Sequence, residues 1–320
     1  MNYRQSLLLS CVALMLASCC AITRAAEPIE TRLELLKSSP RIVFLGDSIT
    51  AGGGYVAGFE AWLLSQRWAK SPIIINAGLP SETASGLSEE GHAGGAFPRP
   101  DVAERLARVL KETKPDLVFA CYGMNCGIYQ PFSDERFARY QQGIEQLKAA
   151  VEKAGATIIL VTPPFYDDHG QKKQDYYDGV LARYSDWLVS QRKSGWQVID
   201  LHSAMASEVT KRRQQDPKFT FAGDGVHPND AGHWFIAQHL IAWFGDEKAA
   251  AEASPAAMLK ASGFPLEAWP LVQQRMSVRR DAYVSAAGHK RPGVAKGLPI
   301  EAAEAKAAEI TTKLDALAKP

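Results

Sequence analysis

A serine and a histidine that lie far apart in the sequence could together attack a carbonyl group. Ser48 follows the stretch from Arg41 to Leu45, whose last four residues are apolar, and such a run is typical of a strand buried on both faces. A serine in the turn after such a strand places its hydroxyl at the carboxyl edge of a sheet, where open α/β proteins bind ligands. His227 is the candidate base, and Asp224, three residues earlier, could hold its other ring nitrogen. These residues predict nucleophilic acyl transfer.

Acyl transfer also needs hydrogen-bond donors for the oxyanion that forms during attack. The backbone amide of Ser48 is one such donor. Gly78 follows a second apolar run, 73–77, and has no side chain to block its amide. Asn125 follows a third run, 116–122, and could donate its side-chain amide. We expect these donors to meet at one edge of the sheet, although a glycine and an asparagine there could also serve only the turns.

Four sequence blocks resemble those of the SGNH (GDSL-type) hydrolases and occur in the same order: Gly46-Asp47-Ser48, Gly78, Gly123-Met124-Asn125 and Asp224-Gly225-Val226-His227. The resemblance extends from about residue 41 to residue 244. It implies a flavodoxin-like three-layer α/β/α fold, serine esterase activity and no cofactor. It also implies a catalytic triad of Ser48, Asp224 and His227, and an oxyanion hole formed by Ser48, Gly78 and Asn125.

The sequence departs from this family at one position near the expected oxyanion hole. Cys126 stands where many members have an aspartate. That carboxylate would orient the preceding asparagine, so the thiol could loosen Asn125 or alter the pocket. Asp47, by contrast, is expected to be a turn residue, because aspartate side chains bond nearby backbone amides in turns.

The apolar runs alternate with helical patterns, which predicts a parallel sheet covered on both faces. Five strands are expected at 41–45, 73–77, 116–122, 157–162 and 197–201. The hydrolase domain is expected to span residues 27–246, followed by a helical C-terminal extension at 247–320. Five prolines are expected to break this extension into short helices: Pro255, Pro265, Pro270, Pro292 and Pro299. It has few large apolar residues, so we expect it to pack across the main domain.

The first 26 residues resemble an export signal. Arg4 precedes an apolar run from Leu7 to Ala17, and small residues follow. The sequence Leu16-Ala17-Ser18-Cys19 resembles the lipobox of bacterial lipoproteins, which would give a lipid anchor through Cys19; a plain signal peptide is the alternative. We expect an exported protein that is periplasmic, a membrane-anchored lipoprotein or extracellular, with no transmembrane helix in the mature chain.

Composition and cysteine usage narrow the possible partners. The chain of 320 residues is 46% hydrophobic and 22% charged, with a net charge of +1, so nothing indicates a nucleic-acid partner. Cys121 and Cys126 are expected to be free thiols. No cysteine or histidine cluster has metal-ligand spacing, so neither a metal site nor a cofactor is expected.

The expected substrate is a carboxylic ester in a small molecule or a glycan. Export, and the lack of an obvious hydrophobic lid helix, favour removal of short acyl groups such as acetyl from carbohydrates, by analogy with the family. Two alternatives remain open: a lipid or lysophospholipid esterase, and a catalytically weak SGNH module that binds glycans.

Overall fold

Five parallel strands form a single sheet at the centre of the molecule. The computed structural model describes residues 28–169 and 176–318, so the expected export signal and Cys19 lie outside the described residues. The strands are arranged in the order β2-β1-β3-β4-β5, and every neighbouring pair is parallel. Their bounds are β1 (Arg41–Gly46), β2 (Ile73–Asn76), β3 (Leu117–Cys121), β4 (Thr157–Val161) and β5 (Gln197–Ile199). All five expected strands are confirmed.

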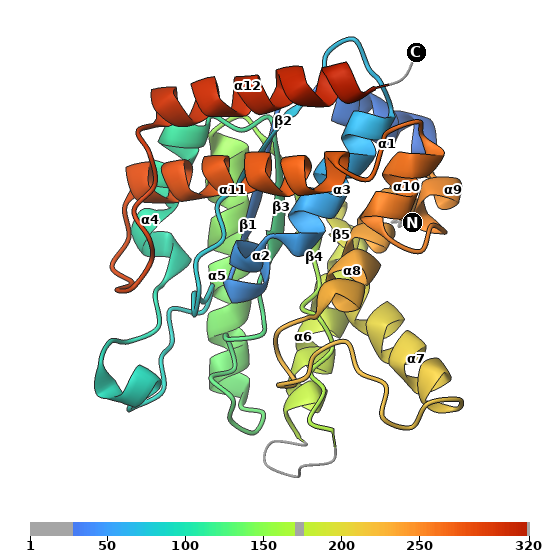
Figure 1. Cartoon of the computed structure of the whole chain (residues 1–320). Coiled ribbons are helices and arrows are strands. Elements are labelled where there is room, and N and C mark those ends of the chain that lie inside the picture. Colours follow the sequence, from blue (N-terminus) through green and yellow to red (C-terminus); the bar gives the residue numbers. More distant parts are fainter. Residues whose placement is uncertain (1–27, 170–175, 319–320) are drawn as a thin grey trace, which may run out of the picture.

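Helices cover both faces of this sheet (Figure 1). The chain crosses the sheet in one direction between β1 and β2 and then returns past β1 to reach β3, β4 and β5. Right-handed crossovers therefore place α3 on one face, and α4, α5 and α6 on the other. The helix α8 packs against α3. The bounds are α3 (Gly54–Ser65), α4 (Val102–Thr113), α5 (Asp134–Lys153), α6 (Tyr177–Ser190), α7 (Leu201–Arg213) and α8 (Asp230–Trp243). The predicted three-layer α/β/α class is confirmed.

Aromatic side chains hold the sheet to one helical layer. Phe44 of β1 stacks on Phe119 of β3 with ring centroids 4.8 Å apart, and Phe59 of α3 meets both rings edge-on. These three side chains are at most 1% exposed. Because aromatic rings bury large areas and prefer such geometries, this cluster fixes β1, which leads directly to Ser48.

The C-terminal extension contains α9 (Glu247–Ala250), α10 (Pro255–Ala261), α11 (Ala268–Ala287) and α12 (Ile300–Leu317). The prediction of short helices was wrong for α11, which has 20 residues. Pro270 lies in its first turn, where a backbone N–H has no helical partner, so proline does not interrupt the helix there. α11 and α12 lie side by side (Figure 1), and α11 also packs against β2, α3 and α4.

Buried ion pairs fasten the extension to the main domain. Glu60 of α3 is 3% exposed and accepts a hydrogen bond from Arg275 Nε at 2.7 Å. Arg279 lies 3.7 Å from the same carboxylate and also contacts Glu304 of α12. Arg280 of α11 donates to the carbonyl of Ala51 at 2.9 Å. The extension thus reaches the short helix α2 (Ser48–Gly52), which begins with the expected nucleophile.

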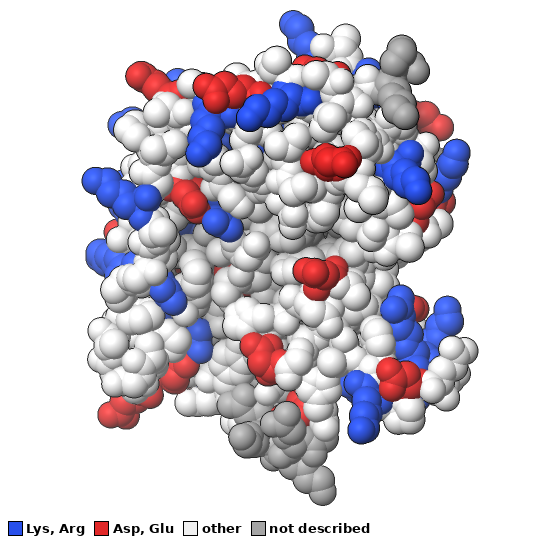
Figure 2. Space-filling view, viewed as in Figure 1, with Lys and Arg blue, Asp and Glu red and all other residues white. Residues whose placement is uncertain are grey.

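The surface in Figure 2 carries its charges mainly around the edge of the face shown, with Lys and Arg interspersed with Asp and Glu. The middle of that face is mostly white, but a few separate Asp or Glu side chains lie there too. Within residues 28–169 and 176–318, no helix is both long and apolar enough to cross a membrane. The remaining described helices are α1 (Ile29–Lys37) and two short 3-10 segments, η1 (His92–Gly95) and η2 (Gln191–Ser194).

Candidate active site

The structure brings Ser48, His227 and Asp224 together in one chain of contacts. Ser48 is the first residue of α2, directly after β1, and the carboxylate of Asp47 caps this helix by accepting the Ile49 N–H at 3.0 Å. Asp47 is therefore a turn residue, as predicted. Ser48 Oγ lies 2.9 Å from His227 Nε2. His227 Nδ1 lies 2.6 Å from Asp224 Oδ2.

The Asp224 carboxylate also fixes the backbone of its own turn. Its Oδ1 accepts the N–H groups of Val226 at 2.9 Å and His227 at 2.7 Å. Partial burial works to raise the pKa of Asp224, but the hydrogen bonds from the His227 backbone and imidazole outweigh it, and the pKa lies below its ordinary value. An ionised Asp224 keeps a proton on Nδ1 of His227. The Nε2 atom is then left as an acceptor for the Ser48 hydroxyl.

Asn125 lies at the end of β3 with its side chain clamped. It is 4% exposed, and its Oδ1 accepts from Arg99 Nη1 at 2.8 Å and from Tyr129 Oη at 3.3 Å. Arginine can only donate, so the atom facing it must be the amide oxygen. The amide nitrogen therefore points the other way and donates one N–H to the carbonyl of Glu82 at 3.3 Å. Its second N–H remains for another acceptor.

Arg99 is itself held by Glu89, and neither residue was identified from the sequence. Arg99 Nε and Nη2 each lie 2.6 Å from a Glu89 oxygen, and the arginine side chain is 6% exposed. Its guanidinium also lies over the ring of Tyr129, 5.3 Å from the centroid. Both charged residues belong to the long connection between β2 and α4, where no local sequence pattern indicates which side chains turn inward.

Gly78 does not present its amide as expected. The Gly78 N–H donates to Asn76 Oδ1 at 2.9 Å, so this donor is already used. A Cβ atom at Gly78 would lie 2.4 Å from the backbone nitrogen of Ala51, which is closer than any real contact. Close packing against α2 therefore explains the glycine at this position.

Ser81, three residues later, has an unpaired backbone amide near Asn125. Its φ of 68° lies in the left-handed region, which residues other than glycine rarely adopt. Across the described residues, its backbone N–H makes no hydrogen bond. The adjacent Glu82 carbonyl accepts from Asn125, which places this turn beside the asparagine. The sequence gives no signal for it, because a serine is not expected at a positive φ.

A buried ion pair holds the turn that contains Ser81 and Glu82. Arg105 Nε and Nη2 donate to the Glu82 carboxylate at 2.6 and 2.7 Å, and Tyr122 Oη donates to it at 2.6 Å. Arg105 and Glu82 have side-chain exposures of 1% and 0%. Burial raises the pKa of Glu82 despite these partners. The turn is thereby tied to α4 and to the end of β3.

Cys126 is packed into the interior and accepts a hydrogen bond from the Ala84 N–H at 3.2 Å. Burial raises the pKa of its thiol to about 12, so it is not a thiolate at neutral pH and is inert as a nucleophile. Cys121 and Cys126 are both buried free thiols, as predicted. Within the part of the chain that the structure describes, no group of three or more His, Cys, Asp or Glu side chains could hold a metal ion.

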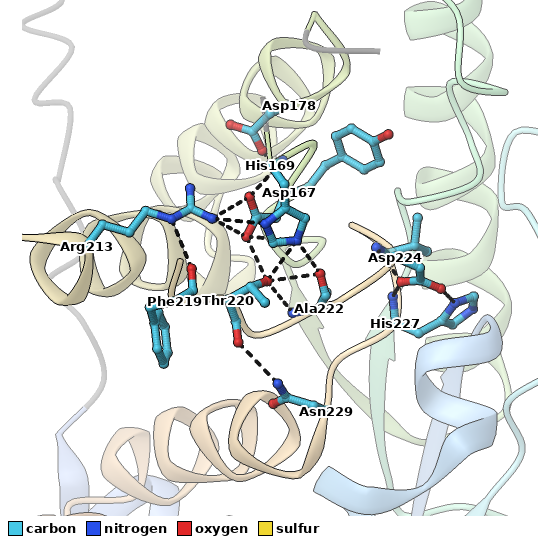
Figure 3. Close-up of polar contacts among 12 residues, drawn as sticks. Asp167, His169, Asp178, Arg213, Phe219, Thr220, Ala222, Asp224, His227 and Asn229 are labelled. Carbon is cyan, nitrogen blue, oxygen red and sulfur yellow. Dashed lines mark hydrogen bonds and ion pairs between the residues drawn. The ribbon is translucent and has the colours of Figure 1, made fainter. Parts of the chain in front are cut away.

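A second polar network holds the turn that carries the triad histidine (Figure 3). Asp167 is 3% exposed and accepts from Arg213 Nη2 at 2.7 Å and from Thr220 Oγ1 at 2.8 Å. Its backbone N–H donates to the carbonyl of Gly225, inside the Asp224–His227 turn, at 3.0 Å. His169 Nε2 lies 2.7 Å from the carbonyl of Ala222. The loop after β4 thus braces the loop before α8.

Comparison with known proteins gives one family match. The model of the GDSL-like lipase/acylhydrolase family matches residues 44–235, whereas no curated protein matches the chain. Among solved structures, a gut microbial diltiazem-metabolizing enzyme is 22% identical, with a TM-score of 0.49. That match covers 64% of this chain and 47% of the other, so the chain spans about half the length of that enzyme.

Two other solved structures that resemble the chain are esterases. A catalytic mutant of Axe2, an acetylxylan esterase from Geobacillus stearothermophilus, is 23% identical over 64% of this chain and 93% of its own, with a TM-score of 0.49. The acetyl xylan esterase AlAXEase is 21% identical over 63% of this chain and 98% of its own, with a TM-score of 0.48.

Proposed function

Because the chain belongs to the GDSL-like lipase/acylhydrolase family and is a carboxylic ester hydrolase, we propose that it removes short acyl groups such as acetyl from carbohydrates through an acyl-enzyme on Ser48. One observation carries this proposal: Ser48 Oγ, the imidazole of His227 and the carboxylate of Asp224 lie in series at 2.9 and 2.6 Å. Hydrogen bonds in this order are what a serine nucleophile, its base and an orienting acid require.

In this mechanism His227 Nε2 takes the hydroxyl proton as Ser48 Oγ attacks the ester carbonyl carbon. The same proton then passes to the leaving alcohol as the ester bond breaks, which leaves the acyl group on Ser48. A water molecule gives its proton to His227 and attacks the acyl-enzyme. His227 then returns that proton to Ser48 Oγ as the bond to the acyl group breaks and the acid product leaves. Asp224 keeps the imidazole in the correct tautomer and stabilises its charged form.

Three N–H groups are suited to stabilise the oxyanion. Ser48 begins α2, so its backbone N–H has no acceptor within the helix. Asn125 has one side-chain N–H left after its contact with Glu82. The unpaired N–H of Ser81 takes the place expected for the Gly78 amide, which is bonded to Asn76. Loss of one such donor typically costs about 3 kcal/mol of barrier.

We assign Arg99 as the positioning residue of this oxyanion hole. Its charged hydrogen bond to Asn125 Oδ1 fixes the direction of the amide and polarises its N–H groups toward a developing negative charge. Glu89 holds the guanidinium in place through two contacts. A preoriented donor costs no reorganisation when the oxyanion forms.

The openness of the site favours a large polar alcohol carrying a small acyl group. The side chains of His227 and Asp224 are 53% and 56% exposed, so the catalytic base lies at the surface. A long acyl chain gains most of its binding energy from apolar burial, whereas a sugar needs mainly polar contacts at an open edge. Export of the protein is also part of this proposal. Residues 1–26 resemble an export signal, and such a signal would carry the active chain out of the cytoplasm.

Hydrolysis of para-nitrophenyl acetate by the purified chain tests the proposal. We expect turnover that falls by about 10⁴-fold or more in Ser48→Ala, whereas Ser190→Ala, at an exposed serine of α6, retains it. Acetylated xylo-oligosaccharides should be cleaved faster than para-nitrophenyl laurate. Preference for the laurate would favour a lipid esterase, and binding of the oligosaccharide without any turnover would contradict the esterase proposal.

A further inference from the structure

A small cavity lies between the C-terminal extension and the edge of the sheet that carries Ser48. Its volume is about 210 Å³. Ala51, Gly78 and Pro80 form the wall on the side of the hydrolase domain. The other wall is formed by α11 and by the segment that follows it, including Arg280, Asp281, Val284, Arg291 and Val294.

The cavity lies close to Ser48, the proposed nucleophile. Ala51 follows Ser48 by three residues in α2, so the two Cα atoms are about 5 Å apart, one turn of helix. Gly78 packs directly against the backbone nitrogen of Ala51. Pro80 precedes Ser81, whose amide is proposed to face the oxyanion. The cavity therefore adjoins the nucleophile helix and the oxyanion turn.

The charges that line the cavity are unbalanced. Arg280 and Arg291 both contribute to its walls, and Asp281 is the one carboxylate among its lining residues. Asp281 accepts from Arg280 Nε at 2.8 Å, and Arg280 also donates to the Ala51 carbonyl. Arg280 is thereby partly neutralised, whereas no carboxylate in the lining pairs with Arg291.

Arg291 is held in place, but only part of its guanidinium has a hydrogen-bond acceptor. Its guanidinium lies over the ring of Phe97 at 5.2 Å, and its Nη1 donates to the Pro292 carbonyl at 2.7 Å. Its Nε is buried and has no hydrogen-bond partner within residues 28–169 and 176–318. This Nε has no accessible surface, so a ligand in the cavity would be held instead by Nη2, which makes no hydrogen bond within the same residues and is not buried. A guanidinium N–H that is free and accessible is suited to bind an anionic group.

We propose that this cavity binds a carboxylate of the ester substrate, with Arg291 as its main partner. Guanidinium groups bind carboxylates through charged, often paired, hydrogen bonds. The small volume fits a carboxylate and a few carbon atoms. The carboxylate could belong to the alcohol, as in an acidic sugar, or to the acyl group, as in a monoester of a dicarboxylic acid. This inference rests on the proposed function and specifies its substrate.

Binding to the Ser48→Ala chain tests the cavity separately from turnover. Calorimetry would compare two pairs of esters that differ in one carboxylate: acetylated methyl galacturonoside against acetylated methyl galactoside, and methyl hydrogen succinate against methyl butanoate. We expect the acidic member of one pair to bind at least about tenfold more tightly, an effect of about 1.4 kcal/mol. The pair that shows the preference identifies the side of the ester that carries the charge.

Two further substitutions in the Ser48→Ala background show where the preference originates. Arg291→Gln should abolish it, and Lys296→Gln, which removes an exposed charge from the same segment, should leave it intact. Equal affinity within both pairs, no detectable binding of either acidic ester, or a preference that survives Arg291→Gln would overturn the inference. Turnover of para-nitrophenyl acetate by the parent chain reports on the esterase proposal independently of all these outcomes.

Discussion

Asn125 is oriented by Arg99, which lies 26 positions earlier in the sequence, rather than by the residue that follows it. Cys126, its neighbour, is turned inward toward the Ala84 amide, and Arg99 holds the asparagine oxygen instead. The concern that a thiol at this position loosens Asn125 therefore loses its basis, because the orienting contact comes from another loop.

Substitution of Arg99 tests this positioning role. Arg99→Gln should lower kcat for para-nitrophenyl acetate by about 10- to 100-fold with little change in KM, less than the loss expected for removing a whole donor. Because Arg99 acts through Asn125, the same substitution should have little further effect in an Asn125→Ala background. Equal losses in both backgrounds, or a kcat loss that tracks the melting temperature, would contradict the assignment.

The protonation of Asp47, in the turn that carries the nucleophile, should make the stability of the fold depend on pH. Burial raises the pKa of its carboxyl to about 6, above the value of about 4 in an unfolded chain. The protonated form therefore favours the folded state, and the stability it contributes below about pH 4 is lost as pH rises through about 6. Asp47→Asn cannot titrate and keeps an acceptor for the Ile49 N–H. Urea unfolding should show its free energy of unfolding, relative to the parent, rising by about 3 kcal/mol between pH 4 and pH 7; a constant difference would contradict this.

The elements follow from the sequence most clearly where burial is complete. The runs at Ile42–Leu45 and Leu117–Cys121 are apolar on both faces, so their assignment as central strands needed no tertiary information. The long helix α11 was missed because a proline in a first turn and a proline inside a helix look alike in a sequence. Contacts between loops were also missed, since nothing local couples Asp167 to Gly225 or Arg99 to Asn125.

The loop that bears His227 depends on the loop after β4. Asp167→Asn would remove the charge that Arg213 and Thr220 both contact. Since Arg213 is 30% exposed, solvent reduces the cost, and we expect a loss of about 1–3 kcal/mol in stability. The turnover should fall about tenfold, because small displacements of a catalytic group are costly.

Hydrogen exchange would show whether the effect is local. The amides of Val226 and His227 should exchange faster in Asp167→Asn, while those of α5 stay unchanged. Asp216→Asn, at an exposed aspartate near the same loop, is the matched control. Unchanged exchange at both amides would mean that this network does not position the triad.

On the scale of the whole molecule, the extension and the hydrolase domain share a buried polar junction. Glu60→Ala would leave Arg275 and Arg279 without their common carboxylate. Loss of one partner from a buried ion pair typically costs 3–5 kcal/mol, so thermal unfolding should begin well below the parent's temperature. Glu301→Ala, at an exposed position of α12, should have almost no effect. Similar melting temperatures for both variants would show that the junction contributes little.

The meeting of four distant turns was predictable because a parallel sheet brings its carboxyl ends to one edge. Ser48, His227 and Asp224 needed only that topology to come together. The identity of each oxyanion donor did not follow, because Asn76 takes the Gly78 amide in a contact that only the folded backbone reveals. The cavity beside Ser48 was equally hidden, since most of its lining residues lie more than 200 positions later in the sequence.

The contact between Arg280 and the end of α2 has a consequence for how the enzyme matures. Arg280 follows Ala51 by 229 positions in the sequence, so the ribosome synthesises the nucleophile helix long before this supporting residue. A partly made chain can contain the serine, the histidine and the aspartate and still lack the side chains that close around them. Catalytic competence should therefore arise only after the chain has been synthesised as far as Arg280, and a chain truncated before this residue should lose activity although its reacting groups are all present.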